Sequence, residues 1–304
     1  VTLALISSGI IPAVKAEVND ANVDNPAGTT IDQGSGTKAV DLDNGSTFTI
    51  TNAGTISASS SNNYTSGINV DSSTTVSTLT NSGTILGETT TTSYRAGRGI
   101  AFESHASIGT LTNSGTITGQ GRSYDGRGIY MNSTNGTLSS FINTSSGIIQ
   151  GISGEGLNGG QNNKGYIAIG ASLFASDSIS TTFDNDGIIR GLSDTSYARG
   201  VIESNKVGTF DNSGTILGQT DTNGATGMES AYSSRSMDTL NNSGTISGVT
   251  GTNDAYGIQL LKSSYGTINN SGTINATATT SASYGVYLYG YYGVDTVSYT
   301  HLTL

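Results

Sequence analysis

The chain has 304 residues, a net charge of −10, 43 glycines and no cysteine. Only 11% of its residues are charged and 34% are hydrophobic, against about 25% and 45–50% in ordinary globular domains, so the composition argues against a compact α/β enzyme. The lack of cysteine excludes disulfides and cysteine metal ligands from this sequence, and the acidic balance disfavours binding to nucleic acids.

The N-terminal residues 1–16 combine an apolar run with Val14 and Ala16, a small-residue cleavage pattern. We interpret this segment as the remnant of a secretory signal peptide, because the run is shorter than the about 20 residues that a membrane-spanning helix needs. The alternative is a buried first strand or a capping helix. Residues 17–36 are predicted to form an N-terminal cap or linker.

A repeat fills residues 37–296. The motif Asn-Ser-Gly-Thr-Ile occurs at 81–85, 113–117, 212–216, 242–246 and 270–274, with variants at 52–56, 145–149 and 185–189. A fixed core with variable spacing indicates a constant framework with variable loops. Because Asn tolerates the left-handed conformation and Gly turns without a Cβ penalty, the motif predicts a corner between two strands. The stacked Asn amides are expected to form a ladder.

Each unit carries three short apolar segments. Ile lies two residues after the corner glycine in every copy, and a large apolar residue lies four residues before it, except that Asn143 takes that place before Gly147 and Phe141 comes two residues earlier. The third position is filled by Val40, Ile68, Ile100, Ile129, Val201, Met228, Ile258 and Val286, with Ile167 offset by one. Short Thr- and Ile-rich segments bounded by turn residues are typical of strands. The prediction is an all-β, right-handed parallel β-helix of about 8–9 coils with three short strands per coil.

Tyrosines gather in the loops before the third strand of several units, and arginines accompany three of them. Tyr and Arg are enriched in binding hot spots, so this pattern predicts an exposed ridge that binds a partner. The alternative is packing at the strand flank, with Arg stems along Tyr rings. The ridge comprises Tyr94, Arg98, Tyr124, Arg127, Tyr197, Arg199, Tyr256 and Tyr284.

The sequence contains no clear catalytic, cofactor-binding or metal-binding constellation, and we expect a protein that is not an enzyme. His105 is interpreted as a loop residue. Asp71 with Glu103, and Glu203 with Glu229, are expected on neighbouring coils about 4.8 Å apart, near the spacing of a retaining carboxylate pair. Exposed acids that keep strand ends soluble are the alternative interpretation.

The C-terminal residues 297–304, Val-Ser-Tyr-Thr-His-Leu-Thr-Leu, resemble the translation of a transposase-type sequencing adapter. We therefore interpret this tail as non-native and the chain as a truncated fragment. The alternative is a natural strand. Just before it, Val294-Asp-Thr-Val297 aligns with Met237-Asp-Thr-Leu240, which predicts that another corner is about to begin.

The tandem units, as in Thr78–Ile85, behind a signal peptide resemble the passenger region of bacterial autotransporters over roughly residues 37–295. The resemblance implies Sec export and passage across the outer membrane with a C-terminal β-barrel translocator, which this fragment lacks. It also implies a location at the bacterial cell surface or outer membrane, or outside the cell.

Three functions are consistent with this pattern. The first is a structural stalk, adhesin or self-association module without catalysis or cofactor, whose partners are proteins or glycans on host or neighbouring cells, or other copies of itself. The second is a carbohydrate-active enzyme, a glycosidase or polysaccharide lyase, on a β-helix. The third is an ice-binding solenoid, which needs a regular outward array of threonines. That column contains Thr55, Thr84, Thr116, Thr215, Thr245 and Thr273 and is broken by Ile148 and Ile188.

Overall fold

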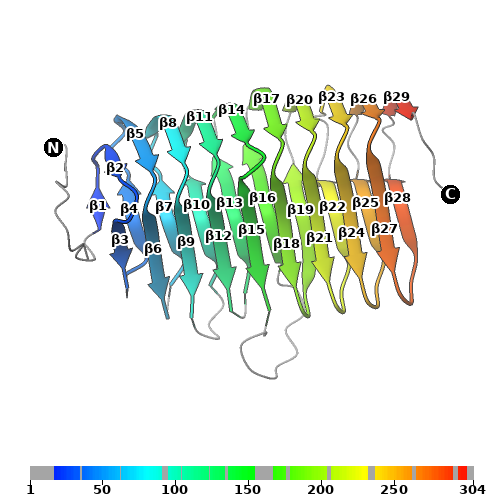
Figure 1. The fold of residues 1–304 in the computed structure, drawn as a ribbon, viewed down its shortest axis with the longest axis horizontal. Coiled ribbons are helices and arrows are strands. Elements are labelled where there is room, and N and C mark those ends of the chain that lie inside the picture. Colours follow the sequence, from blue (N-terminus) through cyan, green and yellow to red (C-terminus); the bar gives the residue numbers. More distant parts are fainter. Residues whose placement is uncertain are drawn as a thin grey trace.

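The computed structural model describes residues 17–299 except 35, 62, 91–94, 104, 123, 134–135, 155–166, 176–178, 204–206, 232–236, 262–264 and 290–293. Every regular element in the described part of the chain is a strand, and all strand pairings there are parallel (Figure 1). Three strands form each coil, and each strand pairs with its counterpart in the coils before and after it. The predicted parallel solenoid with three strands per coil is therefore confirmed.

The strands form three long sheets. The first sheet contains β1 (Val18–Asn19), β4 (Lys38–Leu42), β7 (Thr65–Val70), β10 (Gly97–Glu103), β13 (Gly126–Ser133), β16 (Ile167–Ala175), β19 (Tyr197–Glu203), β22 (Ala225–Ala231), β25 (Ala255–Leu261) and β28 (Ser283–Tyr289). The second contains β2 (Val23–Asn25), β5 (Thr47–Asn52), β8 (Thr75–Asn81), β11 (Ser107–Asn113), β14 (Leu138–Asn143), β17 (Ile179–Asn185), β20 (Val207–Asn212), β23 (Thr239–Asn242), β26 (Tyr265–Asn270) and β29 (Val294–Tyr299). The third contains β3 (Thr30–Gln33), β6 (Thr55–Ser60), β9 (Thr84–Thr89), β12 (Thr116–Gly121), β15 (Ile148–Ser153), β18 (Ile188–Ser193), β21 (Thr215–Thr220), β24 (Thr245–Thr250) and β27 (Thr273–Ala278).

The coil count differs slightly from the predicted eight to nine, because the first two sheets contain ten strands and the third contains nine. The short strands β1 to β3, within residues 17–36, pair in register with the next coil. At the other end, Val297 lies within β29 and pairs with Ile268, so residues 297–299 of the adapter-like tail continue the second sheet. The expected signal-peptide remnant at 1–16 lies outside the described residues.

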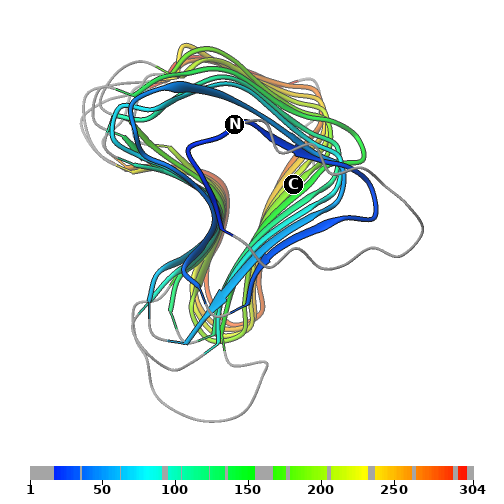
Figure 2. The ribbon, with the colours of Figure 1, turned by 90° about the vertical axis from the view of Figure 1, so that its left-hand side faces the viewer.

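The chain winds as a right-handed solenoid. Seen from its N-terminal end in Figure 2, the backbone runs up the first sheet, across the second and down the third as it recedes. The first sheet bends inward, so its outer surface is concave. This shape explains why outward side chains of this sheet, such as Ser66, Asn69 and Thr226, are almost fully buried.

One hydrophobic core runs along the axis, because each inward position repeats from coil to coil. The third sheet contributes an uninterrupted column of nine isoleucines, from Ile31 to Ile274. The second sheet contributes Leu111, Phe141, Phe183 and Phe210 in succession. Phe141 rather than Asn143 occupies the apolar column, so the turn between this strand and Gly147 is two residues longer than in the other corners.

The asparagines of the corners form the expected ladder. Each side-chain amide donates to the side-chain oxygen of the next asparagine at 2.6–2.9 Å, and the ladder contains Asn25, Asn52, Asn81, Asn113, Asn143, Asn185, Asn212, Asn242 and Asn270. Every one of these side chains is buried. A buried amide needs partners for its donors and its acceptor, and the stacking supplies them without any solvent.

The corner glycines are required for a different reason from the one predicted. None of the described residues with positive φ belongs to an Asn-Ser-Gly-Thr-Ile corner. Instead, successive corners stack so closely that a Cβ on Gly83 would lie 2.0 Å from the Gly54 carbonyl oxygen, and one on Gly115 would lie 2.1 Å from that of Gly83. Such separations are far below van der Waals contact, so the motif requires glycine for close approach.

The coil after Gly147 departs from the predicted apolar column. Ala171, not Ile167, pairs with Ile129 and Val201 at the inward position, while Ile167 pairs with Tyr197. The spacing between corner glycines is longest here. The backbone pairing of β16 with its neighbours, and not the position of the nearest large apolar residue, decides which residue faces inward. Ile169 and Ile202 form a small second cluster with Ile167 packed against it.

Candidate functional site

The predicted ridge lies on the concave outer face of the first sheet. One register column of this sheet contains Arg98, Arg127, Ile169, Arg199, Thr226, Tyr256 and Tyr284 in consecutive coils. Tyr197 lies two positions before Arg199 on β19, and Tyr124 comes just before β13. Tyr94 lies outside the described residues. Residues far apart in the sequence are therefore aligned along the axis, as the repeat predicts.

The arginines of the ridge are largely engaged within the protein. Arg98 pairs with Glu103, and the Arg127 guanidinium lies 2.5 Å from the Asp125 carboxylate. The ring of Tyr130 lies between the two arginines, with guanidinium-to-centroid distances of 4.1 Å from Arg98 and 4.6 Å from Arg127. Tyr64 covers Arg98 at 4.9 Å on the other side. At this end of the ridge, the geometry matches strand-flank packing, the alternative weighed from the sequence.

Sequence reasoning missed two tyrosines: Tyr64, which lies two residues before Ser66 just as Tyr197 lies two residues before Arg199, and Tyr130, which lies within a strand rather than in the loop before it. Tyr130 occupies the outward position three residues after Arg127, in register with Ala101 and Ser172. The spacing of Arg127 and Tyr130 on one strand was the available signal. It becomes informative only when the register is known.

Tyrosines dominate the C-terminal half of the column. The rings of Tyr256 and Tyr284 are nearly parallel, with centroids 5.4 Å apart, and Tyr287 lies within 5.2 Å of both. Burial, followed by the neighbouring Asp254 carboxylate, raises the pKa of Tyr256 to about 12. The hydroxyl therefore stays protonated at neutral pH and donates to Asp254 Oδ2 at 3.2 Å.

Between these two halves lies a groove of about 450 Å³. Its lining residues come from four consecutive coils and include Tyr197, Arg199, Thr226, Glu229, Tyr256, Gln259 and Ser281. The depression exists because Gly224, just before β22, and Thr226 on β22 are small. The equivalent positions are Tyr197 and Arg199 on β19 and, in the next coil, Asp254 just before β25 and Tyr256 on it. Two small residues between two coils of large ones leave room for a ligand.

Two of the three charged groups in the groove, Arg199 and Glu229, offset each other, and Asp254 leaves one net negative charge. Arg199 pairs with Glu229 and also lies 5.5 Å from the Tyr197 ring centroid. The Asp254 carboxylate accepts hydrogen bonds from Ser281 and from the backbone N–H of Ala282, and these lower the pKa of Asp254 in that order of effect. The groove is therefore rich in fixed donors and acceptors but has little net charge.

Of the two carboxylate pairs expected from the sequence, Glu203 and Glu229 do not come together, whereas Asp71 and Glu103 directly follow the paired residues Val70 and Phe102 on neighbouring strands. Glu203 pairs in register with Ser230 and lies in the inward column after Leu173, whereas Glu229 pairs with Ile202 and faces outward. A shift of one residue places successive side chains on opposite faces of a strand, so the two carboxylates are separated by the sheet. Glu103, for its part, is bound to Arg98. His105 is an exposed turn residue.

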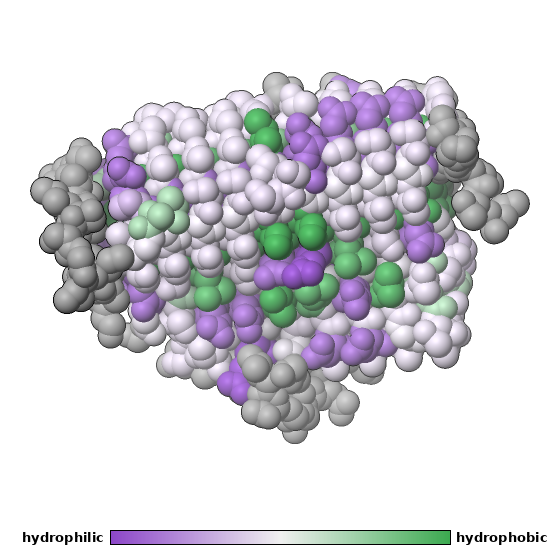
Figure 3. Space-filling view, in the orientation of Figure 1, coloured by the Kyte–Doolittle hydropathy of each residue, from purple (hydrophilic) through white to green (hydrophobic). Residues whose placement is uncertain are grey.

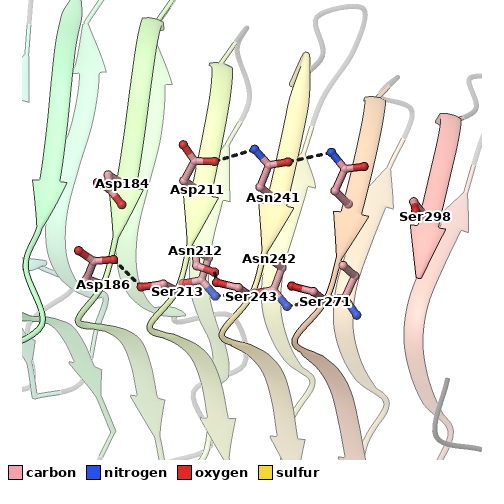
Figure 4. Close-up of a pocket in the computed structure, with 12 residues that line it drawn as sticks. Asp184, Asp186, Asp211, Asn212, Ser213, Asn241, Asn242, Ser243, Ser271 and Ser298 are labelled. Atoms are coloured by element: carbon pink, nitrogen blue, oxygen red, sulfur yellow. Dashed lines mark hydrogen bonds between the residues drawn. The ribbon is translucent and has the colours of Figure 1, made fainter. Parts of the chain in front are cut away.

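A second groove, of about 520 Å³, lies on the outer face of the second sheet and at its corners (Figure 4). Asn269 donates to Asn241 at 2.8 Å and Asn241 donates to Asp211 at 2.7 Å, which forms an outward ladder beside the buried one. Asp184 comes next in the same column. Burial, and then the charges of Asp186 and Asp211, raise the pKa of Asp184.

Asp184→Asn is expected to stabilise the protein at neutral pH. A carboxyl whose folded-state pKa is raised binds protons more tightly when folded, so its ionisation reduces stability as the pH rises through the unfolded and then the folded pKa. The amide removes this charge and can donate to Asp211, which continues the ladder. Urea unfolding at neutral and acidic pH should show a gain that shrinks on acidification. The exposed Asp221→Asn, a matched control, should show little change, and an equal gain for both variants would contradict the assignment.

The third sheet presents a flat outer face. The threonine column of the ice-binding hypothesis is a true register column, and Ile148 and Ile188 interrupt it as the sequence indicates. Figure 3 shows apolar side chains gathered around a hydrophilic spot near the middle of this face. The register places Ile148, Ile152, Ile188, Leu192, Gln150 and Arg190 there, with the Arg190 guanidinium bound to Gln150 Oε1.

Comparisons with known proteins do not assign this chain to a family. No protein-family profile matches it, and no curated protein or solved structure matches it. Within the described ranges, no three His, Asp or Glu side chains lie close enough together to hold a metal ion. The part of the chain that the structure describes also contains no helix long and apolar enough to cross a membrane.

Proposed function

We propose that the chain is part of an exported, non-catalytic adhesive scaffold of the autotransporter-passenger type, displayed at the bacterial cell surface or outside the cell. It binds a protein or glycan of another cell, or a second copy of itself, through the concave face of the first sheet. The observation that supports this proposal is the alignment of Arg98, Arg127, Arg199, Tyr256 and Tyr284 in one column, which Ile169 and Thr226 interrupt. Repeated weak contacts along a rigid column favour multivalent binding.

Exposed tyrosines on this face supply the proposed contacts. Tyr64, Tyr197 and Tyr284 are 42%, 43% and 38% exposed, and Tyr rings contribute large contact area at little conformational cost. Each of these rings also contacts a side chain of the protein, namely Arg98, Arg199 or Tyr256. Thermal unfolding of the variants therefore separates an effect on binding from an effect on folding.

Beads coated with the purified chain are expected to retain bacterial or host cells, and a variant with Tyr64, Tyr197 and Tyr284 replaced by Ser should retain about tenfold fewer. The matched control replaces Gln219, Thr273 and Thr277, exposed on the third sheet, by Ser and should retain cells like the unmodified chain. Equal retention by both variants contradicts the use of the concave face.

The carbohydrate-active enzyme is the competing proposal, and the same preparation tests it. Under our proposal a panel of glycans stays intact in the presence of the chain. Hydrolysis of a panel member that disappears in Glu103→Gln or Glu203→Gln would overturn the non-catalytic assignment.

A further inference from the structure

We propose that the groove between Tyr197 and Tyr256 binds one pyranose ring of an uncharged glycan, with the sugar stacked on Tyr256. This inference deepens the proposed adhesive function and rests on it for its biological meaning. The groove itself is defined by Tyr197, Arg199, Gly224, Thr226 and Tyr256.

The stacking position follows from the tyrosine ladder. Tyr284 covers one face of the Tyr256 ring, and Thr226 is the next residue of the same column on the other side. Thr226 is too small to fill the place that a third aromatic ring would take. A ligand ring in this place continues the stack.

The size of the gap suits a single ring. Arg199 and Tyr256 are two coils apart, which is roughly 9.6 Å between strands at the usual spacing. A ring in van der Waals contact on both sides needs about 3.5–4 Å to each neighbour. The Tyr197 ring lies over Gly224, where an added Cβ would be 3.0 Å from Tyr197 Cε1, so it forms a side wall of the groove.

The polar lining indicates a hydroxyl-rich ligand. Gln259, Asn253 and Ser281 line the groove with amide and hydroxyl groups, and Thr226 Oγ1 lies 3.4 Å from Gln259 Oε1. Sites built to hydrogen-bond hydroxyls discriminate strongly against ligands that lack them. These groups have partners within the protein, and their further hydrogen-bonding capacity would go unused by a purely aromatic ligand.

The balance of charge favours an uncharged sugar. The Arg199–Glu229 pair is almost fully buried at Glu229, and Asp254 is already bound by Ser281 and Ala282. An anionic sugar would have to compete with Glu229 for Arg199 and would lie near Asp254. A cationic ligand would compete with Arg199 for Glu229.

Thr226→Tyr provides a selective test. The column already holds Tyr256 and Tyr284, so a tyrosine at 226 is expected to stack on them and to leave the fold intact while it fills the groove. Gln219→Tyr adds the same side chain on the exposed face of the third sheet and is the matched control. Thermal unfolding of both variants establishes that they are folded.

Binding is measured by titration calorimetry with neutral trisaccharides of glucose, galactose and mannose, with a uronic acid trisaccharide and indole as the charged and aromatic probes. We expect a neutral sugar to bind, with affinity reduced about tenfold or more by Thr226→Tyr and unchanged by Gln219→Tyr. Three results would overturn the proposal. They are unchanged affinity in folded Thr226→Tyr, a preference for the uronic acid or indole, and no binding of any sugar at millimolar concentration. Cell retention without sugar binding contradicts only this inference, whereas sugar binding without cell retention contradicts only the adhesive function.

Discussion

Replacing Phe183 with Ala is expected to reduce the free energy of unfolding by about 3–5 kcal/mol, the usual cost of truncating a buried aromatic side chain. Phe183 is fully buried between Phe141 and Phe210, with ring centroids 3.9 and 4.2 Å away. Alanine would remove both stacking contacts and leave a cavity near the middle of the solenoid. The coils on either side cannot collapse into that cavity without breaking their hydrogen-bonded register.

Urea unfolding followed by far-ultraviolet circular dichroism measures this loss. Phe183→Leu keeps much of the volume and should cost less than half as much as the alanine variant. Thr182→Ala removes an exposed side chain one residue earlier on the same strand and should change the stability by about 0.5 kcal/mol or less. A loss in Phe183→Ala no larger than that in Thr182→Ala contradicts a continuous aromatic core.

Replacing Asn143 with Ala is expected to reduce the free energy of unfolding by about 2–4 kcal/mol. The substitution removes the acceptor of the Asn113 amide and the donor to the Asn185 side-chain oxygen, 2.9 and 2.8 Å away. Each buried polar group left without a partner costs about 1–3 kcal/mol. The chain is close-packed here, so the cavity left by the amide is lined by its former partners.

Two further variants serve as comparisons for Asn143→Ala. Asn143→Asp keeps the shape but loses the amide donor and buries a charge, so we expect it to be at least as destabilising as alanine. Asn269→Ala is the matched control, because Asn269 is exposed and belongs to the outward ladder. If the denaturation midpoints of Asn143→Ala and Asn269→Ala shift equally, the buried ladder does not have the stabilising role assigned to it.

Much of the fold follows from the repeat. The isoleucine after each corner glycine marks the inward face of the third sheet in every copy, and the asparagine two residues before the glycine marks the buried ladder except at Gly147, where Asn143 takes that role. Both inferences succeed because a parallel solenoid places equivalent residues of successive repeat units directly next to one another. The glycine was assigned correctly to the corner but for the wrong reason. It is required because the backbones of neighbouring coils approach closely, and the sequence of a single repeat unit does not reveal that approach.

The candidate site was less accessible from the sequence. The alignment of Arg199 with Tyr256 follows from the repeat. The Arg199–Glu229 pair does not, because Arg199 and Glu229 occupy different positions within their repeat units. The sequence suggested instead that Glu203 and Glu229 are neighbours. Glu203 and Glu229 occupy register positions one residue apart, so the Glu203 carboxylate faces the core column and the Glu229 carboxylate faces the surface.

The sequence by itself therefore determined the kind of fold, the three strands of each coil and the residues that stack along its axis, because inward positions must repeat wherever one face is buried. Only the tertiary structure decided which outward side chains meet. Outward positions are free of the packing constraint that fixes inward ones, so large and small residues follow one another there from coil to coil. The groove at Thr226 arises in this way: it exists because one coil carries small residues where both of its neighbours carry large ones, a relation that appears only when the coils are stacked.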